Sequence, residues 1–289
     1  MSNNDWQKEF PFESKFFDQG GVRQHYIDEG EGEPIVMVHG NPTWSFYYRH
    51  LISSFRSTHR VVAVDHVGCG LSDKPKKYKY RLSTHVHNLK NIVSNLKLEN
   101  ATLVVHDWGG PIGLGMWMIL MQRFKRVVLL NTAAYIPKEI PFGLQVARWP
   151  ILGAIGVRGL NLFCKKALTT GVADSQSLDA VARQGLLAPY DSWANRVAVH
   201  NFVLDIPLKT SHPSYSGLQL LETALPQLAE IPVKMIWGMK DWVFNGDVLD
   251  EMIRRIPHAE VNRLENVGHY VMEEGREQVV ELVQDFVGR

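Results

Sequence analysis

Short runs rich in Val, Ile and Leu recur along the chain without polar alternation, and they mark the expected strands. From residue 34 onward these runs lie at Ile35–Val38, Arg60–Asp65, Ala101–Val105, Arg126–Leu130 and Pro232–Trp237. Runs of this kind are typical of parallel strands that are covered on both faces. Earlier in the chain, Lys15–Asp18 and Val22–Asp28 flank Gly20 and Gly21, and this arrangement predicts a hairpin.

Segments with helical spacing separate the expected strands. Thr84–Leu96 carries an apolar stripe that fits a helix packed on one side. Pro111–Gln122 is apolar almost all round, which indicates a buried helix behind a central strand. Val271–Val287 is amphipathic and predicts one C-terminal helix, with Glu273, Glu274 and Glu277 near its N-terminus, where the helix dipole favours negative charge. Strands that alternate with helices predict an α/β fold with a mostly parallel, doubly wound sheet.

The alternation stops between about residues 135 and 212, where no convincing strand is present. Four weakly amphipathic pieces lie there instead, at Phe142–Trp149, Leu160–Lys166, Ser177–Leu187 and Asp191–Leu204. We expect this stretch to form a helical cap inserted over the sheet. The predicted division is therefore a core of residues 1–134 and 213–289 and a cap of residues 135–212.

Composition and charge narrow the class of protein. Apolar residues make up 45% of the chain and charged residues 21%, and 31 Lys and Arg against 30 Asp and Glu give a net charge of +1. A balanced charge argues against nucleic acid as a partner. The chain has two cysteines and no visible secretory signal, so we expect a cytoplasmic protein. It has no apolar run of about 18 residues, so we expect no membrane span. The sequence is compatible with self-association and leaves the oligomeric state open.

The most informative segment runs from Leu103 to Pro111 and reads Leu-Val-Val-His-Asp-Trp-Gly-Gly-Pro. A buried strand that leads through a glycine-rich turn into a buried helix is the setting of a nucleophile elbow. Asp107 occupies the position where serine is usual. A carboxylate there suits attack on a carbon that bears a leaving group, because the ester formed can later be hydrolysed. The alternative role for Asp107 is the N-cap of the following helix.

A second motif, His39-Gly40-Asn41-Pro42-Thr43, directly follows a predicted strand. In elbow hydrolases this loop supplies one N–H group of the oxyanion hole, and the residue after the nucleophile supplies the other. The backbone N–H groups of Asn41 and Trp108 are therefore the expected pair. We interpret His39 as a structural histidine beneath the loop.

Two further residues complete the predicted triad. Asp241 follows a strand, at the edge of the sheet where ligand sites of α/β proteins lie, and His269 follows another strand in Gly268-His269-Tyr270. The order Asp107, Asp241, His269 is that of elbow hydrolases. His269 would act as the base, and Asp241 would orient it. Asp65 is a rival acid, which we interpret as part of a structural turn tied to Arg49.

Together, His39-Gly40-Asn41-Pro42-Thr43, His106-Asp107-Trp108-Gly109-Gly110 and Gly268-His269-Tyr270 resemble the haloalkane dehalogenases of the α/β-hydrolase superfamily. The resemblance implies an α/β-hydrolase fold with an inserted helical cap. It also implies hydrolysis of a carbon–halogen bond through an aspartyl ester, with the halide held by the indole N–H of Trp108 and the amide of Asn41. Some members carry a glutamate acid at a position near Asn131, and its absence here supports Asp241.

The resemblance leaves alternatives open. β-Lactone decarboxylases of bacterial long-chain olefin synthesis look like dehalogenases at the catalytic positions, so they are the main rival. Epoxide hydrolases share the aspartate nucleophile but favour an aromatic residue at position 41 and need cap tyrosines, for which Tyr190 and Tyr215 are candidates. The sequence shows no metal-ligand cluster or phosphate-binding glycine motif, so we expect no metal and no cofactor.

Cap residues are expected to set the size of a small hydrophobic substrate. The candidate pocket residues are large and apolar: Phe142, Trp149, Phe163, Leu168, Trp193 and Phe202. At helical spacing, such residues also pack a cap against its core, so the prediction applies to the group.

Overall fold

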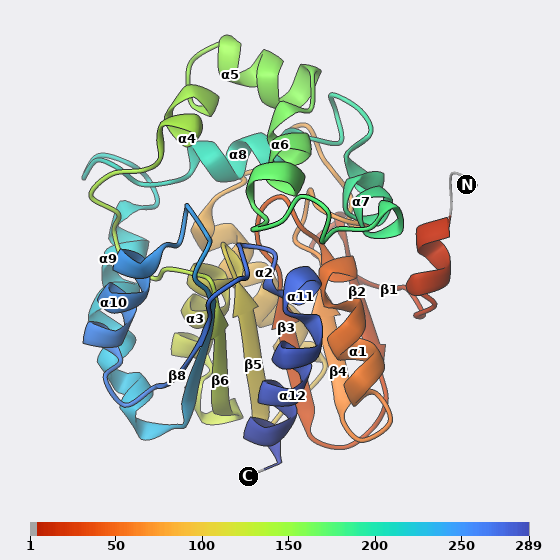
Figure 1. Ribbon diagram of the computed structural model, residues 1–289, viewed down its shortest axis with the longest axis vertical. Coiled ribbons are helices and arrows are strands. Elements are labelled where there is room, and N and C mark those ends of the chain that lie inside the picture. The colour runs from red at the N-terminus through yellow and green to blue at the C-terminus, as the bar shows by residue number, and fades with distance from the viewer. Residues whose placement is uncertain (1–4, 289) are drawn as a thin grey trace.

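The computed structural model describes residues 5–288, and one eight-stranded sheet forms the centre of the fold (Figure 1). Its order is β1-β2-β4-β3-β5-β6-β7-β8. The strands are β1 (Lys15–Asp18), β2 (Arg23–Glu29), β3 (Pro34–Val38), β4 (Arg60–Val64), β5 (Ala101–His106), β6 (Phe124–Leu130), β7 (Val233–Gly238) and β8 (Glu260–Leu264). Strands β3 to β8 are parallel, whereas the predicted hairpin β1–β2 pairs antiparallel with β4. The predicted mostly parallel sheet is confirmed.

Helices cover both faces of the sheet, which explains why its strands are hydrophobic without alternation. One face carries α1 (Arg49–Phe55), α11 (Val271–Glu274) and α12 (Arg276–Val287); the other carries α2 (Leu82–Asn95), α3 (Gly109–Ile119), α9 (Tyr215–Ala224) and α10 (Gly246–Arg255). Along β5, Val104 packs into the core beneath α1, α11 and α12, while Leu103 and Val105 pack into the core on the opposite face of the sheet. The apolar side chains on both faces of this strand are therefore buried in a core.

The C-terminal helix differs from the prediction. The expected single helix is divided at Gly275 into α11 and α12. A Cβ at Gly275 would lie 3.0 Å from the side chain of Leu264, so the backbone makes a close approach there. Glu273 and Glu274 have contacts beyond the helix dipole, because Glu273 pairs with Arg49 and Glu274 accepts the N–H of Gly268.

Residues 135–212 lie over the carboxyl ends of the parallel strands, at the top of Figure 1. Within this described stretch there are helical elements and no strand: α4 (Phe142–Ala147), α5 (Leu152–Ala154), the π-helical turn η4 (Ile155–Gly159), α6 (Leu162–Thr170), α7 (Ala180–Leu187), the 3-10 turn η5 (Ala188–Tyr190) and α8 (Val197–Leu204). Three of the four predicted pieces contain a helix, namely α4, α7 and α8. The fourth piece, Leu160–Lys166, only overlaps α6, which continues to Thr170. The exact division into core and cap remains a prediction. No helix between residues 5 and 288 has the length and apolar character needed to cross a bilayer.

Candidate active site

The elbow between β5 and α3 holds Asp107 in a constrained backbone conformation. Its φ of 50° is in the left-handed region, which is uncommon for residues other than glycine. The backbone N–H of Asp107 donates to the Asn131 carbonyl at 3.1 Å, and its carbonyl accepts from the Thr132 hydroxyl at 2.6 Å. A Cβ on Gly109 would lie 2.0 Å from the carbonyl oxygen of Val38, so this close turn requires glycine. The surrounding chain therefore fixes the strained elbow.

The carboxylate of Asp107 lies against the loop predicted to supply the oxyanion hole. Its Oδ1 accepts the backbone N–H of Asn41 at 2.5 Å, and the Trp108 N–H also bonds to the carboxylate. The two predicted backbone N–H groups thus converge on the carboxylate of the predicted nucleophile. Burial raises the pKa of Asp107, while the neighbouring His269 and the two N–H groups oppose that rise.

The other two predicted triad members are in direct contact. His269 Nδ1 lies 2.8 Å from Asp241 Oδ2, and both side chains are buried. The second oxygen of Asp241 accepts the N–H groups of Val243 and Phe244. Burial lowers the pKa of His269, but Asp241 and Asp107 outweigh it, so the pKa lies above 6.5. Asp107, Asp241 and His269 therefore form one electrostatically coupled group.

Asn131 has a role that the sequence analysis missed. Its Nδ2 donates to Asp241 Oδ2 at 3.0 Å and to the Gly238 carbonyl at 3.1 Å, and its Oδ1 accepts the Gly238 N–H at 2.7 Å. The side chain is fully buried and ties β6 to the loop that carries the acid. The sequence feature that could have identified this role is a polar residue directly after a hydrophobic strand. Asn131 positions Asp241.

Asp65 and Arg49 do not contact each other, so the predicted tie between them is wrong. Asp65 accepts from His25 and from the backbone N–H groups of Ser45 and Leu71. Arg49 instead makes a bidentate pair with Glu273, because α1 carries it toward α11. Asp65 thus holds the loops beside β4, away from the triad.

His39 is buried beneath the loop, as predicted. Its Nδ1 bonds to the Gly40 carbonyl at 2.7 Å, and its Nε2 accepts the His66 N–H at 3.1 Å. Both ring nitrogens are engaged with backbone groups, and burial lowers the pKa of the ring. His39 therefore supports the loop and holds no free proton-transfer position.

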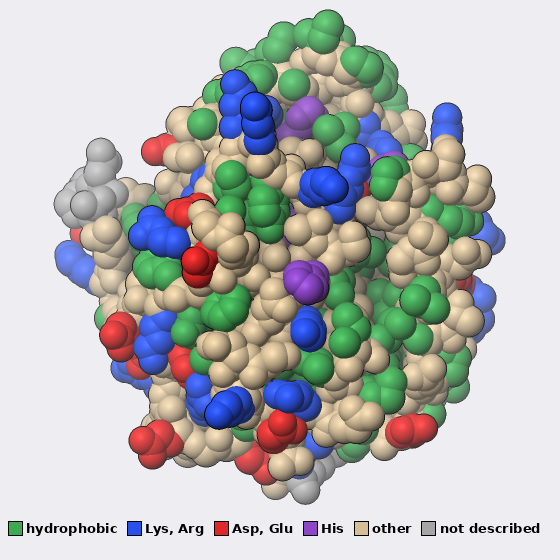
Figure 2. Space-filling model, turned by 180° about the vertical axis from the view of Figure 1, so that it is seen from behind, with side chains coloured by type: hydrophobic (Ala, Val, Ile, Leu, Met, Phe, Trp, Pro, Cys, Tyr) green, Lys and Arg blue, Asp and Glu red, His purple; other side chains and the backbone are tan. Residues whose placement is uncertain are grey.

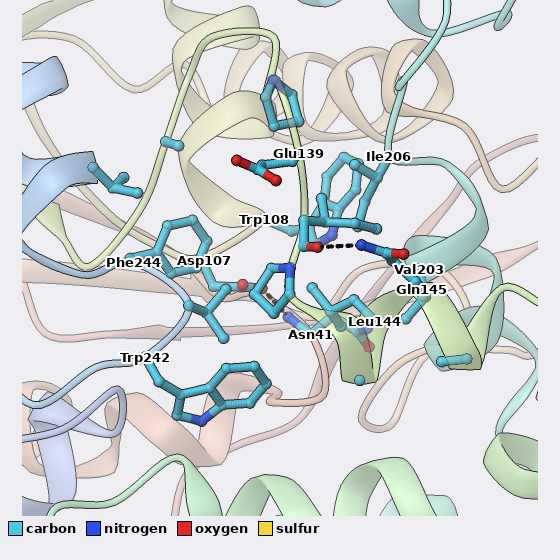
Figure 3. Close-up of a pocket in the computed structure, with 18 of the residues that line it drawn as sticks. Asn41, Asp107, Trp108, Glu139, Leu144, Gln145, Val203, Ile206, Trp242 and Phe244 are labelled. Atoms are coloured by element: carbon cyan, nitrogen blue, oxygen red, sulfur yellow. Dashed lines mark hydrogen bonds between the residues drawn. The ribbon is translucent and has the colours of Figure 1, made fainter.

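Two side-chain donors border the nucleophile. Among the residues that the structure describes, the indole N–H of Trp108 meets no acceptor. The amide Nδ2 of Asn41 donates one hydrogen to the Val199 carbonyl at 3.1 Å and retains a second. Figure 3 shows Asn41, Asp107 and Trp108 together at the cavity, with Trp242 and Phe244 nearby. A group that becomes negative beside Asp107 could accept from both donors.

A cavity of about 1790 Å³ extends from the triad into the helical region, and most of its lining is apolar. Of the six predicted pocket residues, Phe142 and Phe163 line it. Leu168 and Phe202 instead pack in the core, and Trp149 and Trp193 lie at the surface, 48% and 46% exposed. The prediction fails for Leu168 and Phe202 because their faces of α6 and α8 point to the core, and for the two tryptophans because they lie in turns outside the helices. Within residues 5–288, no three His, Cys, Asp or Glu side chains are grouped so that they could hold a metal ion.

Comparison with known proteins places the chain in a family. The profile described as alpha/beta hydrolase fold matches residues 33–276. A cis-3-alkyl-4-alkyloxetan-2-one decarboxylase from Shewanella oneidensis is 42% identical, covering 96% of this chain and 89% of the relative. Haloalkane dehalogenase 2 from Mycobacterium tuberculosis is 29% identical and covers 96% of each chain.

The solved structure of a tetrameric haloalkane dehalogenase from Paraglaciecola agarilytica superposes with a TM-score of 0.81 at 26% identity, covering 97% of this chain and 94% of that one. The similarities extend over nearly the whole chain and include the sheet, the elbow and the helices above it. The predicted resemblance is confirmed, and the relatives support an enzyme. This chain belongs to the α/β-hydrolase family, in the group that includes the β-lactone decarboxylases and the haloalkane dehalogenases.

Proposed function

We propose that the protein is a decarboxylase of cis-3,4-dialkyl β-lactones, with Asp107 as the nucleophile. The observation that carries this choice is the margin in identity, 42% to a decarboxylase against 29% to a dehalogenase over the same share of the chain. The cavity is compatible with the choice, because it is large and mostly apolar and has room for a lactone with two alkyl chains.

The proposed reaction has two steps. In the first, a carboxylate oxygen of Asp107 attacks ring carbon C4, the C4–O bond breaks, and the ring oxygen becomes part of a carboxylate on C3. In the second, the bond between C3 and this carboxylate breaks, CO2 leaves, and the electron pair forms the C3=C4 double bond as the ester bond to Asp107 breaks. The products are an alkene and CO2, and Asp107 is regenerated. The steps consume no water and no oxidant.

The surrounding groups suit this chemistry. The carboxylate released by ring opening develops beside the indole N–H of Trp108 and the free amide hydrogen of Asn41, which would stabilise it. The raised pKa of His269 favours the imidazolium form, which adds a positive charge at the same place. In this reaction His269 acts as a cation and hydrogen-bond donor, with Asp241 holding its orientation.

Haloalkane dehalogenation, the first choice from the sequence, is the second candidate. The unpartnered Trp108 indole favours it, because two donors could hold a leaving halide as well as a carboxylate. Asp107 would displace the halide, and His269 would then take a proton from the water that hydrolyses the ester. Epoxide hydrolysis fits less well. Of its two candidate tyrosines, Tyr215 lines the cavity, but the Tyr190 hydroxyl is buried and donates to the Thr43 carbonyl.

Product analysis with two substrates tests the proposal. The purified protein is incubated separately with a cis-3,4-dialkyl β-lactone and with a 1-bromoalkane, and alkene, CO2 and bromide are measured. We expect alkene and CO2 in equal amounts from the lactone, with no product from the Asp107→Ala variant. Formation of the β-hydroxy acid without alkene, together with bromide release, would replace the decarboxylase by the dehalogenase.

A further inference from the structure

The end of the helical region farthest from the sheet is covered by large apolar side chains. Six residues between positions 149 and 162 are exposed there, and we call them the apolar tip: Trp149, Ile151, Leu152, Ile155, Leu160 and Leu162. They surround α5, which lies at the top of Figure 1, and Figure 2 shows hydrophobic side chains over the same end of the molecule. A contiguous exposed apolar patch of this kind marks an interaction site.

The backbone conformation of Ile151 raises the free energy of the folded chain at the apolar tip. The φ of this residue is 64° and its ψ is −61°, and its side chain is 75% exposed. A β-branched residue is disfavoured at this positive φ, where glycine fits better. Burial does not compensate for the strain. An apolar side chain kept in such a position therefore points to a contact outside the chain.

The segment that carries the apolar tip has positive side chains and no acidic ones. Residues 140–173 contain Arg148, Arg158, Lys165 and Lys166 and no aspartate or glutamate, whereas the whole chain has a net charge of only +1. Within the described part of the chain, none of these four cations forms an ion pair with a carboxylate. Arg158 lies over the Trp193 ring, 4.6 Å from its centre, at the border of the tip. Apolar side chains with a rim of unpaired cations complement an anionic lipid surface.

The cavity reaches the surface at the same place. Leu152 and Leu162 of the apolar tip line the cavity, as does the exposed Phe142 beside it. From there the lining continues through Leu144 to Asp107. The cavity therefore connects the reactive carboxylate with the patch that would contact a lipid surface.

We propose that the apolar tip docks the protein on the surface of a bilayer that contains anionic lipids. The side chains of the tip enter the boundary between headgroups and acyl chains, and the exposed Lys165 and Lys166 remain among the headgroups. A lipophilic substrate then passes from the bilayer into the cavity without crossing water. This last consequence rests on the proposed function, whereas the docking does not.

Vesicle flotation tests the docking. Vesicles of equal parts phosphatidylglycerol and phosphatidylcholine at low salt should carry the wild-type protein, and vesicles of phosphatidylcholine alone or high salt should release most of it. We expect Ile151→Asn and Leu160→Ser each to weaken binding about tenfold. The double variant Lys165→Gln with Lys166→Gln should weaken it about 30-fold, at about fivefold for each charge.

Matched control variants show whether a loss of vesicle binding is specific to the apolar tip. Leu220→Ser removes an equally exposed leucine on α9, and Lys76→Gln with Lys77→Gln removes two charges elsewhere. These controls should float like wild type. Absence of flotation, or equal effects of control and tip variants, overturns the proposal. A tip variant that changes only the oligomeric mass in sedimentation also overturns it, because the tip would then join copies of this chain.

Turnover of a short-chain, water-soluble β-lactone separates this inference from the proposed function. Ile151 does not line the cavity, so Ile151→Asn should retain wild-type turnover in solution while losing vesicle binding. If the proposed function fails, no variant turns over the lactone, yet flotation and its dependence on the tip remain measurable. If the docking fails, turnover persists without flotation.

Discussion

Replacing His269 by glutamine should separate the two reactions that this site could perform. In the structure, Asp241 Oδ2 binds His269 Nδ1 at 2.8 Å, which leaves Nε2 as the nitrogen that can accept a proton. Glutamine has a similar reach but no basic nitrogen. General-base catalysis contributes about 10²–10⁴ in rate, or about 2.7–5.4 kcal/mol of barrier. Only a step that needs a base should lose this contribution.

The two substrates should therefore respond differently. With a bromoalkane, Asp107 attack needs no base, so His269→Gln should release about one equivalent of bromide and then stop as an alkyl-enzyme. With a β-lactone, no later step needs a base, so turnover should continue without a stalled adduct. Its rate should fall by up to about 10²–10³, because the imidazolium donor beside the departing carboxylate is lost.

Rapid-quench bromide measurement and intact-protein mass spectrometry distinguish these outcomes. The alkyl mass should appear on the peptide that contains Asp107, and only with the bromoalkane. His258→Gln, at an exposed histidine, is the matched control and should behave as wild type. Continuous bromide release within tenfold of the wild-type rate, with no adduct, would refute the assignment of His269 as the base. An adduct that accumulates with the lactone would refute the base-free second step.

Four further predictions concern the neighbouring residues. Asp107→Ala should abolish turnover of both substrates while circular dichroism and thermal unfolding remain close to wild type, because the side chain contributes chemistry and little packing. Trp108→Phe should lower bromoalkane kcat about a hundredfold or more and change KM little, since its N–H acts on developing charge; a change confined to KM would contradict this. The acid limb of bromoalkane kcat should lie at lower pH in Asp241→Asn than in the wild type, because Asp241 raises the pKa of His269 and the base form is lost as the pH falls through that pKa. Asn131→Ala should lower the free energy of unfolding by about 3 kcal/mol, at about 1 kcal/mol for each of its three hydrogen bonds, which denaturant titration measures; a loss below about 1 kcal/mol would show that Asn131 does not hold the acid loop.

The sequence by itself determined the sheet and the place of the elbow that carries Asp107. Parallel strands buried on both faces need hydrophobic residues at successive positions, so their pattern is visible without knowledge of their neighbours. The elbow at Asp107 is likewise local, because glycine is required within one turn of the chain where β5 meets α3. The order of Asp107, Asp241 and His269 along the chain, combined with parallel strands, was enough to bring them to one edge.

Tertiary structure decided which distant residues each side chain contacts. The partner of Arg49 is Glu273, 224 residues away, and no local pattern distinguishes it from Asp65. Asn131 contacts Asp241 only because β6 and β7 are neighbours in the sheet. The cap residues were predicted least well, since a short helix shows an apolar face without showing what that face meets. Their rotation about the helix axis, fixed by packing, is what sends Phe163 into the cavity and Leu168 into the core.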